Sequence, residues 1–311
     1  MITVKKYLEQ DKATWDTFVK QSKMPMFMFE RGFMDYHSDR FIDNSLMFYS
    51  DDNLIALLPS SIHNNELRSH GGLTYGGFIV GEEIKQHKML ECFNSLKEYM
   101  AEKQIKQLLY KKIPYIYHSQ PADEDLYGLY RSGADLFKIE PSTVILLKDP
   151  FKMPKGRKAQ ISRAKREGVI IKESNDFDRF IDLENEILKE HHNTKAVHTA
   201  EELKLLKSRF NNEIQLYIAE YGGETIASVL LFVYENTVHT QYMASNDIGR
   251  EIGALDLLIK TLMDKFSNDK TYFDFGISTE SNGSILNEGL ISQKEGFGGR
   301  TVCYASWVLL K

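Results

Sequence analysis

Apolar and polar residues alternate along the chain with two periods, one typical of strands and one typical of amphipathic helices. Period-two segments and short apolar runs predict strands at residues 2–7, 45–50, 53–62, 73–80, 105–113, 142–149, 168–174, 214–220, 224–235, 237–245, 271–278 and 301–310. Helical spacing predicts helices at residues 12–22, 28–41, 83–103, 123–133, 176–192, 199–210, 253–263 and 284–296. Thr199 followed by Glu202 forms a capping box, which supports a helix that begins near residue 200.

The predicted elements follow the same order in both halves of the chain: strand, two helices, three strands, helix, strand, helix, strand. No obvious sequence identity links the halves, so the repeat lies in the elements alone. This order predicts an α/β class of fold, mixed α+β, built from two tandem units at residues 1–150 and 151–311. Each unit is expected to be a mixed sheet flanked by helices. A chain of 311 residues is long enough for two such domains.

The most informative segment runs from residue 244 to 263, where a predicted strand passes through a loop into an amphipathic helix. Glycines in this loop allow close approach of the backbone and angles that other residues avoid. The helix begins near Gly253, with free N–H groups facing the loop. Such a helix start binds phosphate or pyrophosphate, and an ordinary strand-to-helix turn is the competing interpretation. The anion would lie against Ser245, Asn246, Gly249, Arg250, Gly253 and Ala254.

Composition and charge are typical of a soluble globular protein and narrow its partners. The formal net charge of −5 argues against general affinity for nucleic acid or anionic lipid. The first ten residues lack the apolar core of a signal peptide, and no apolar run approaches the ~20 residues that span a bilayer. Cys92 and Cys303 form no metal motif, so a reduced, cytoplasmic environment is expected.

A basic run lies between the two predicted units. Seven of the fifteen residues from Lys152 to Arg166 are Lys or Arg. A solvated linker helix explains such a run. An anion-binding surface for nucleotide phosphates, tRNA or a carboxylate is the alternative.

Several strings resemble motifs of the GNAT acyltransferases, and in particular of the Fem-type transferases, which contain two such units. Arg250-x-x-Gly253-Ala254 resembles the GNAT pyrophosphate loop, although Leu255 stands where that loop has a small residue. Three further segments are similar to the glycine-rich stretch, the linker helix and the closing signature of Fem-like proteins: HGGLTYGGF (70–78), RKAQISRAKREGVII (157–171), and YFDFGIS with GLISQKEGFGG (272–278 and 289–299). The match spans most of the chain and is specific for the superfamily, not for a substrate.

The resemblance implies transfer of an acyl group to an amine or hydroxyl of a small-molecule, sugar-type or cell-envelope precursor acceptor. Acyl-CoA, with acetyl-CoA as the first choice, is the implied donor, and no metal is implied. Peptidoglycan-building relatives use aminoacyl-tRNA instead. The negative net charge and the two short helices in residues 176–210, in place of a coiled-coil arm, disfavour this alternative. A degenerate GNAT pair that only binds a nucleotide sugar or a protein is the third interpretation.

Acyl transfer needs a polarised donor carbonyl, a deprotonated acceptor and a site that holds both. Asp274 is a lone carboxylate in an aromatic strand, so it faces a groove or has a structural partner. We expect it to orient or deprotonate the acceptor. The closing signature implies that Lys294 stabilises the oxyanion, with a surface lysine as the alternative. Backbone N–H groups near Met243 to Ser245 would polarise the carbonyl if the strand splays open there.

Histidine and tyrosine side chains are expected to line the acceptor site. A group of histidines, His191, His192 and His198, brackets a loop where GNAT relatives admit the acceptor. Glycine pairs flanked by His70 and Tyr75 predict a backbone close to a ligand, or else a structural turn. The predicted substrate-binding residues are His70, Tyr75, His191, His192 and Tyr242. Adjacent histidines cannot easily both ligate and no Cys or acidic set completes a shell, so no metal site is expected.

Overall fold

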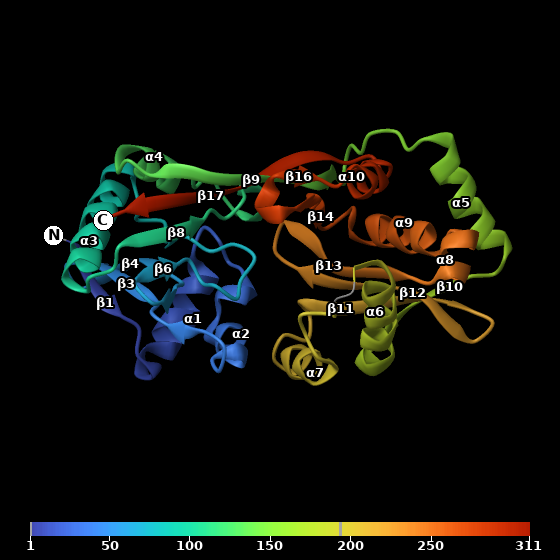
Figure 1. The fold of residues 1–311 in the computed structure, drawn as a ribbon, viewed down its shortest axis with the longest axis horizontal. Coiled ribbons are helices and arrows are strands. Elements are labelled where there is room, and N and C mark those ends of the chain that lie inside the picture. The colour runs from blue at the N-terminus through green and yellow to red at the C-terminus, as the bar shows by residue number, and fades with distance from the viewer. Residues whose placement is uncertain (1, 193–194) are drawn as a thin grey trace. The chain divides into compact units, whose positions relative to one another are not determined.

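The computed structural model describes residues 2–192 and 195–311, and the chain forms two compact units (Figure 1). The first unit contains the residues up to Glu140 together with Ser281–Ser284 and Cys303–Lys311. The second unit contains Pro141–Glu280 and Ile285–Val302. The predicted domain boundary near residue 150 stays a prediction, and the last strand of the chain returns to the first unit.

The first unit begins with β1 (Ile2–Lys6), followed by α1 (Lys12–Gln21) and α2 (Arg31–Met34). Its strands β1, β3, β4 and β7 pair in that order, all antiparallel. Strand β8 pairs in parallel with β6 and antiparallel with β17. The remaining elements are β2 (Ile42–Asp43), β3 (Leu46–Ser50), β4 (Asn53–Leu58), β5 (Ser61–His63), β6 (Glu66–Arg68), β7 (Ile79–Val80), α3 (Gln86–Glu102), β8 (Gln107–Lys111) and α4 (Glu124–Arg131), with 3₁₀ turns at Glu9–Asp11, Phe27–Phe29, Asp35–His37 and Tyr115–Tyr117. Strand β9 (Asp135–Leu146) begins in this unit and continues into the second.

Helix α3 buries the apolar face that its periodicity predicts. Met89, Phe93, Leu96 and Met100 are fully buried. Helix α4 approaches α3 closely because position 128 is a glycine: a Cβ there would lie 2.3 Å from the ring of Phe93. The absence of one side chain therefore sets the spacing of these two helices.

The second unit is a sheet with helices on both faces. Its strands lie in the order β10-β11-β12-β13-β14-β9. Neighbouring strands run antiparallel, except that β13 and β14 are parallel. Its elements are α5 (Lys155–Arg166), β10 (Ile170–Ser174), α6 (Phe177–His192), α7 (Ala200–Arg209), β11 (Ile214–Tyr221), β12 (Glu224–Val233), β13 (Thr237–Ser245), α8 (Asp247–Ile252), α9 (Ala254–Phe266), β14 (Tyr272–Ile277), β15 (Thr279–Glu280), β16 (Ile285–Leu286) and α10 (Glu288–Glu295). Strand β17 (Arg300–Leu310) begins in this unit and ends in the first unit, which also contains a 3₁₀ turn at Ser281–Gly283.

Strand alternation gives the second sheet two different faces. Val229 on β12, Val238 on β13 and Phe273 on β14 belong to the apolar core that α9 covers. Leu230 and Tyr242, which pair across β12 and β13, point to the opposite face. Helices α6 and α7 lie on that opposite face (Figure 1). We call it the α6 face.

The mixed α+β class and the helix-flanked mixed sheets are confirmed, but several predicted elements differ. The predicted strand at residues 73–80 is reduced to β7, because Gly77 has a φ of +96° and lies against the ring of Tyr110. The predicted strand at residues 53–62 is broken around Pro59 into β4 and β5, since proline cannot donate to a sheet ladder. The predicted loop after Ser245 contains the short helix α8.

Candidate active site in the second unit

Strands β13 and β14 diverge after a short parallel pairing. They pair over Thr237–His239 and Tyr272–Asp274 only, whereas β13 continues to Ser245. Beyond His239, no strand among the described residues pairs with that edge of β13. The sequence-based condition that the strand splays open near Met243 to Ser245 is therefore met by the pairing pattern.

Asp274 lies at the point of divergence and is completely buried. Its Oδ2 is 2.9 Å from His239 Nδ1, and its Oδ1 accepts hydrogen bonds from Ser142 Oγ at 2.5 Å and from the Gly276 N–H at 3.0 Å. These three partners stabilise a carboxylate in an otherwise apolar strand. The sequence left two alternatives for Asp274, a groove or a structural partner, and the structure gives it structural partners. One of them is the imidazole of His239, which Asp274 holds in place.

The sequence reasoning did not single out His239. The pairing of His239 with Asp274 follows from strand register, because the two residues lie opposite each other in the parallel pair of β13 and β14. The only signal in the sequence is a histidine within the apolar strand at residues 237–245. A histidine held by a carboxylate is a common arrangement for proton transfer.

Lys294 lies near Asp274 but donates to the backbone. Its Nζ is 3.0 Å from the Gly276 carbonyl and 2.7 Å from the Ile277 carbonyl. Burial lowers the pKa of Lys294 to about 8, while Asp274 opposes that shift. The predicted surface alternative does not fit, because this side chain is buried at the end of β14. Its assignment to the oxyanion remains a prediction.

The segment predicted to bind pyrophosphate uses many of its N–H groups internally. Asn246 caps α8 through Oδ1, which accepts from the Gly249 N–H at 2.9 Å, and its carbonyl accepts from the Arg250 N–H. The Gly253 N–H donates to the Gly249 carbonyl. Arg250 itself donates to the Ser245 carbonyl at 2.6 Å and pairs with Asp247.

The two glycines of this segment lie against the protein's own backbone. A Cβ at Gly249 would be 2.3 Å from the Ile226 carbonyl oxygen. Gly253 has a φ of +78°, joins α8 to α9, and a Cβ there would be 2.8 Å from the Gln160 carbonyl oxygen in α5. Ala254 is buried at the start of α9. Helix packing therefore accounts for both glycines, and the role of these residues in binding a donor stays a prediction.

A second polar group lies on the α6 face. Tyr242 OH is 2.7 Å from His198 Nδ1, and the Tyr242 ring packs edge-on against Phe180 at 5.9 Å. Phe180 and Tyr242 come from α6 and β13, which pack together. The structure thus brings predicted residue Tyr242 together with His198, which the sequence placed in the acceptor loop.

Glu184 is a buried carboxylate that sequence reasoning missed. It is 4% exposed on α6, and its Oε1 is buried without a hydrogen-bond partner in the described structure. Burial raises the pKa of Glu184 to about 7. The signal was available, because Phe177, Phe180, Ile181 and Glu184 follow the i, i+3, i+4, i+7 spacing of the buried side of a helix.

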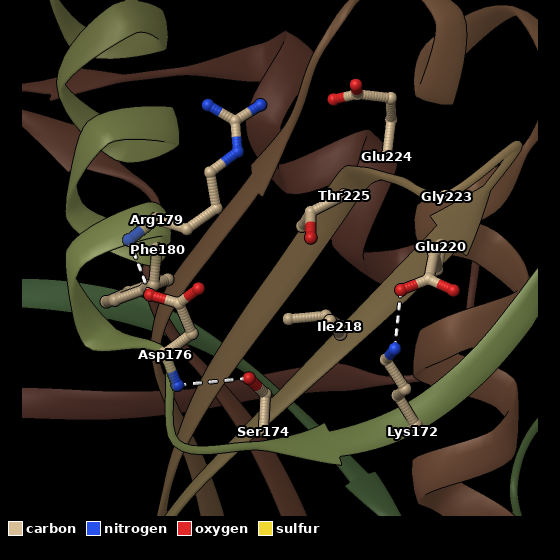
Figure 2. Close-up of a pocket in the computed structure, with 10 residues that line it drawn as sticks. All are labelled: Lys172, Ser174, Asp176, Arg179, Phe180, Ile218, Glu220, Gly223, Glu224 and Thr225. Atoms are coloured by element: carbon tan, nitrogen blue, oxygen red, sulfur yellow. Dashed lines mark hydrogen bonds and ion pairs between the residues drawn. The ribbon is translucent and has the colours of Figure 1, made fainter.

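A pocket of about 320 Å³ opens near the first turn of α6 (Figure 2). Phe180 and Ile218 supply apolar lining, while Arg179 and Glu224 extend from α6 and β12 (Figure 2). Because Phe180 also contacts Tyr242, this pocket and the Tyr242–His198 pair share one wall.

The remaining predicted site residues lie elsewhere. His70 and Tyr75 belong to the first unit; His70 is buried beside His37, and Tyr75 packs against Tyr117 and Tyr304. Burial lowers the pKa of His70 to about 3, which keeps it neutral. The side chains of His191 and His192, at the end of α6, lie outside the described residues.

No group of three or more His, Cys, Asp or Glu side chains in residues 2–192 and 195–311 is arranged to hold a metal ion. None of the described helices combines the length and apolar character needed to cross a bilayer.

Comparison with known proteins identifies the class of the second unit. Residues 155–281 match the family described as the acetyltransferase (GNAT) domain. No curated protein matches the chain.

Solved structures share this fold over nearly the whole chain at low sequence identity. FemX gives a TM-score of 0.69 at 10% identity, with 99% of this chain and 97% of FemX covered. The C-terminal domain of a putative lysylphosphatidylglycerol synthetase from Agrobacterium fabrum gives 0.63 at 13%, with 96% and 91% covered. A tandem GNAT protein from the clavulanic acid biosynthesis pathway gives 0.52 at 10%, with 99% and 98% covered.

The domain match and the fold agree. Residues 155–281 match the acetyltransferase (GNAT) domain, and this match assigns the acyltransferase class. The predicted resemblance to the GNAT superfamily is confirmed, as is the predicted enzyme class.

Proposed function

We propose that the second unit transfers an acyl group from acyl-CoA, acetyl-CoA in the simplest case, to an amine or hydroxyl of a small-molecule or sugar-type acceptor. The observation that carries this proposal is the divergence of β13 from β14 beyond His239. An unpaired strand edge offers an extended slot for the donor arm. It also offers N–H groups near Met243 to Ser245 that could stabilise the oxyanion of the tetrahedral intermediate.

Polar residues at the divergence have distinct tasks in this proposal. His239, held at Nδ1 by Asp274, accepts the proton that the acceptor loses and passes it to the leaving thiolate as the carbon–sulfur bond breaks. Lys294 fixes the two carbonyls at the end of β14 and so keeps the strands apart. The acceptor approaches from the α6 face, where Tyr242 and His198 lie.

A second donor, aminoacyl-tRNA, is favoured by the charges around α5 and α9. Asp256, in the first turn of α9, pairs with Arg157 and occupies the helix start where a phosphate would otherwise bind. Four exposed α5 cations make no ion pair within the described residues: Lys155, Lys158, Lys165 and Arg166. The name of the lysylphosphatidylglycerol synthetase neighbour suggests a cell-envelope acceptor for such a donor.

Thermal shift and product formation separate these donors. The full chain is melted with acetyl-CoA, with charged tRNA and with neither, and acyl transfer to added acceptors is measured in parallel. A donor at 100 times its Kd stabilises the native state by about 2.7 kcal/mol, so the true donor raises Tm. A His239→Ala variant should keep that Tm shift and lose turnover.

Each outcome has a separate meaning. A Tm shift and transfer with charged tRNA alone would replace acyl-CoA as donor. A Tm shift with no transfer to any acceptor would favour the degenerate binding protein. No Tm shift and no transfer with either donor would overturn the proposal.

A further inference from the structure

The pocket of about 320 Å³ at the start of α6 has no part in the proposed acyl transfer. Its lining comes from α6, from strands β10, β11 and β12, and from the turn between β11 and β12 (Figure 2). None of the described residues that line it comes from β13 or β14, the strands that diverge after His239 and Asp274. The pocket is therefore separate from the atoms that the proposed transfer involves.

Five charged side chains line this pocket, and three of them are matched within the protein. Lys172 on β10 pairs with Glu220 on β11. Asp176 precedes α6, and its Oδ1 accepts a hydrogen bond from the Arg179 N–H at 3.0 Å, as a helix cap does. The positive end of the helix dipole stabilises the Asp176 carboxylate as well. One cation and one anion are left, the guanidinium of Arg179 and the carboxylate of Glu224.

These two groups have no side-chain partner among the described residues. Arg179 is half-buried and Glu224 is exposed. Figure 2 shows the two side chains extending from different walls of the pocket, α6 and β12, and no ion pair joins them. Apolar lining comes from Phe180 and Ile218, which are 1% and 7% exposed. A hollow with apolar lining and a few converging polar groups is the usual form of a small-molecule site.

We propose that this pocket binds a zwitterion, a molecule with one carboxylate and one ammonium group, as in a free amino acid or a short peptide. The planar guanidinium of Arg179 suits the carboxylate, because it can donate two parallel N–H bonds. The carboxylate of Glu224 accepts from the ammonium group. An apolar side chain of the ligand packs on Phe180 and Ile218. The inference concerns binding alone and goes beyond the proposed acyl transfer.

Charge balance separates a zwitterion from simpler ligands. An anion alone would pair with Arg179 and leave Glu224 unmatched in the same pocket. An organic cation alone would pair with Glu224 and leave Arg179 unmatched. A metal cation does not fit, because no group of three or more His, Cys, Asp or Glu side chains in residues 2–192 and 195–311 is arranged to hold one. A ligand with both charges matches both residues.

The first experiment measures binding to the unmodified full chain by isothermal titration calorimetry, with no acyl donor present. The probes are leucine, the dipeptide leucyl-leucine, leucinamide, which lacks the carboxylate, and N-acetyl-leucine, which lacks the ammonium group. A zwitterion should bind, and removal of either charge should weaken binding by about tenfold or more, the scale of a lost hydrogen bond to a charged group. Tighter binding of the dipeptide would identify a peptide, and tighter binding of leucine a free amino acid.

Two results of this experiment would overturn the inference. One is that neither leucine nor leucyl-leucine binds. The other is that leucinamide or N-acetyl-leucine binds as tightly as leucine, since the corresponding charge would then have no partner in the protein.

The second experiment assigns each charge to one residue. Arg179→Gln should weaken leucine binding about tenfold and leave leucinamide binding unchanged, because leucinamide lacks the group that Arg179 receives. Glu224→Gln should weaken leucine binding and leave N-acetyl-leucine binding unchanged. Arg166→Gln and Glu186→Gln, which change exposed charges on α5 and α6, are the controls and should bind leucine as the unmodified chain does.

The third experiment tests whether the pocket is separate from the diverging strands. His239→Ala should bind leucine as tightly as the unmodified chain, although the proposed acyl transfer would lose its proton carrier. Loss of leucine binding in His239→Ala, with normal binding in Arg179→Gln, would locate the ligand at the divergence and overturn the inference. A failure of acyl transfer with every donor would count against the proposed function only, because these titrations contain no donor.

Discussion

At the scale of single residues, the proposed acyl transfer depends on a few buried polar side chains. Asp274 and Lys294 stand in the sequence as a lone carboxylate and a lysine near a glycine-rich turn. The structure gives each of them protein partners: His239, Ser142 and Gly276 for Asp274, and backbone carbonyls for Lys294. Positioning of the β13–β14 divergence is therefore their most direct effect.

Replacing Lys294 by alanine should reduce stability. The carbonyls of Gly276 and Ile277 would lose their donor, and a buried acceptor left unpaired costs about 1–3 kcal/mol. Chemical denaturation of Lys294→Ala should show that loss, while Gln293→Ala, at an exposed position of the same helix, should not. A Lys294→Ala variant of normal stability whose turnover falls by about 10²–10³-fold would instead support the oxyanion role.

Glu184 should make stability depend on pH. Its folded pKa is raised from 4.5 to about 7, so between these values the native state binds more protons than the unfolded state. Stability is then lost as pH rises from about 4.5 through 7, by up to roughly 3 kcal/mol at 1.36 kcal/mol per pKa unit. Glu184→Gln should remove this dependence in urea titrations across that range. Parallel curves for the variant and the unmodified chain would contradict it.

At the scale of elements, the junction of α8 and α9 shows that glycines spaced as in a phosphate-binding loop can serve helix packing. The glycines of the predicted phosphate loop allow α8 to pack against β12 and α5 to cross the start of α9. Arg157 of α5 pairs with Asp256 in the first turn of α9 and stacks over Phe297 at 4.1 Å. The basic run thus forms a helix that is partly engaged with the second unit and partly exposed.

Gly253→Ala should destabilise the chain more than Gly168→Ala does. Both glycines have positive φ, +78° and +81°, so both substitutions introduce backbone strain of roughly 1 kcal/mol. Only at Gly253 would the new methyl group also meet backbone, at 2.8 Å from the Gln160 carbonyl oxygen. Thermal denaturation of the two variants therefore compares backbone strain alone, in Gly168→Ala, with backbone strain plus steric overlap, in Gly253→Ala. Equal losses in Tm would show that α5 does not constrain this junction.

At the scale of the whole molecule, the two units do not correspond to two continuous segments of the chain. Strand β17 begins in the second unit and ends in the first, where Ser306 to Leu310 pair with Lys111 to Gln107. Leu309 is fully buried there. The first unit is therefore completed by residues that are distant in sequence.

Residues 1–150 alone should fail to fold cooperatively. They lack the part of β17 that pairs with β8, which leaves that edge of β8 and the buried Leu108 and Tyr110 without their neighbouring strand. Appending residues 303–311 through a flexible linker should restore a cooperative thermal transition, measured by circular dichroism. A scrambled version of the same nine residues is the control. A cooperative transition of residues 1–150 without any addition would support the predicted boundary at 150 as a folding boundary.

The sequence by itself determined the elements whose signals are local. Helix α3 follows its apolar period, and the Thr199–Glu202 capping box forms as predicted at the start of α7, because caps and periodicity depend on residues three or four positions apart. The order of those elements, with the closing signature, was enough to indicate the tandem fold and the acyltransferase class. The glycine-rich strings at residues 70–78 and 245–254 could equally arise from ligand approach or from internal packing.

Only the tertiary structure decided which polar residues meet. His239 lies beside Asp274 because two strands that are 35 positions apart pair in parallel, and Ser142 joins them from 132 positions away. Glu184 gained its raised pKa from helix packing, since burial is a property of the folded surroundings. Strand β17 likewise lies beside β8 because the two strands, which are distant in sequence, pair with each other. Local patterns cannot carry such information, because the partner's identity is set by strand register and by the packing of distant segments.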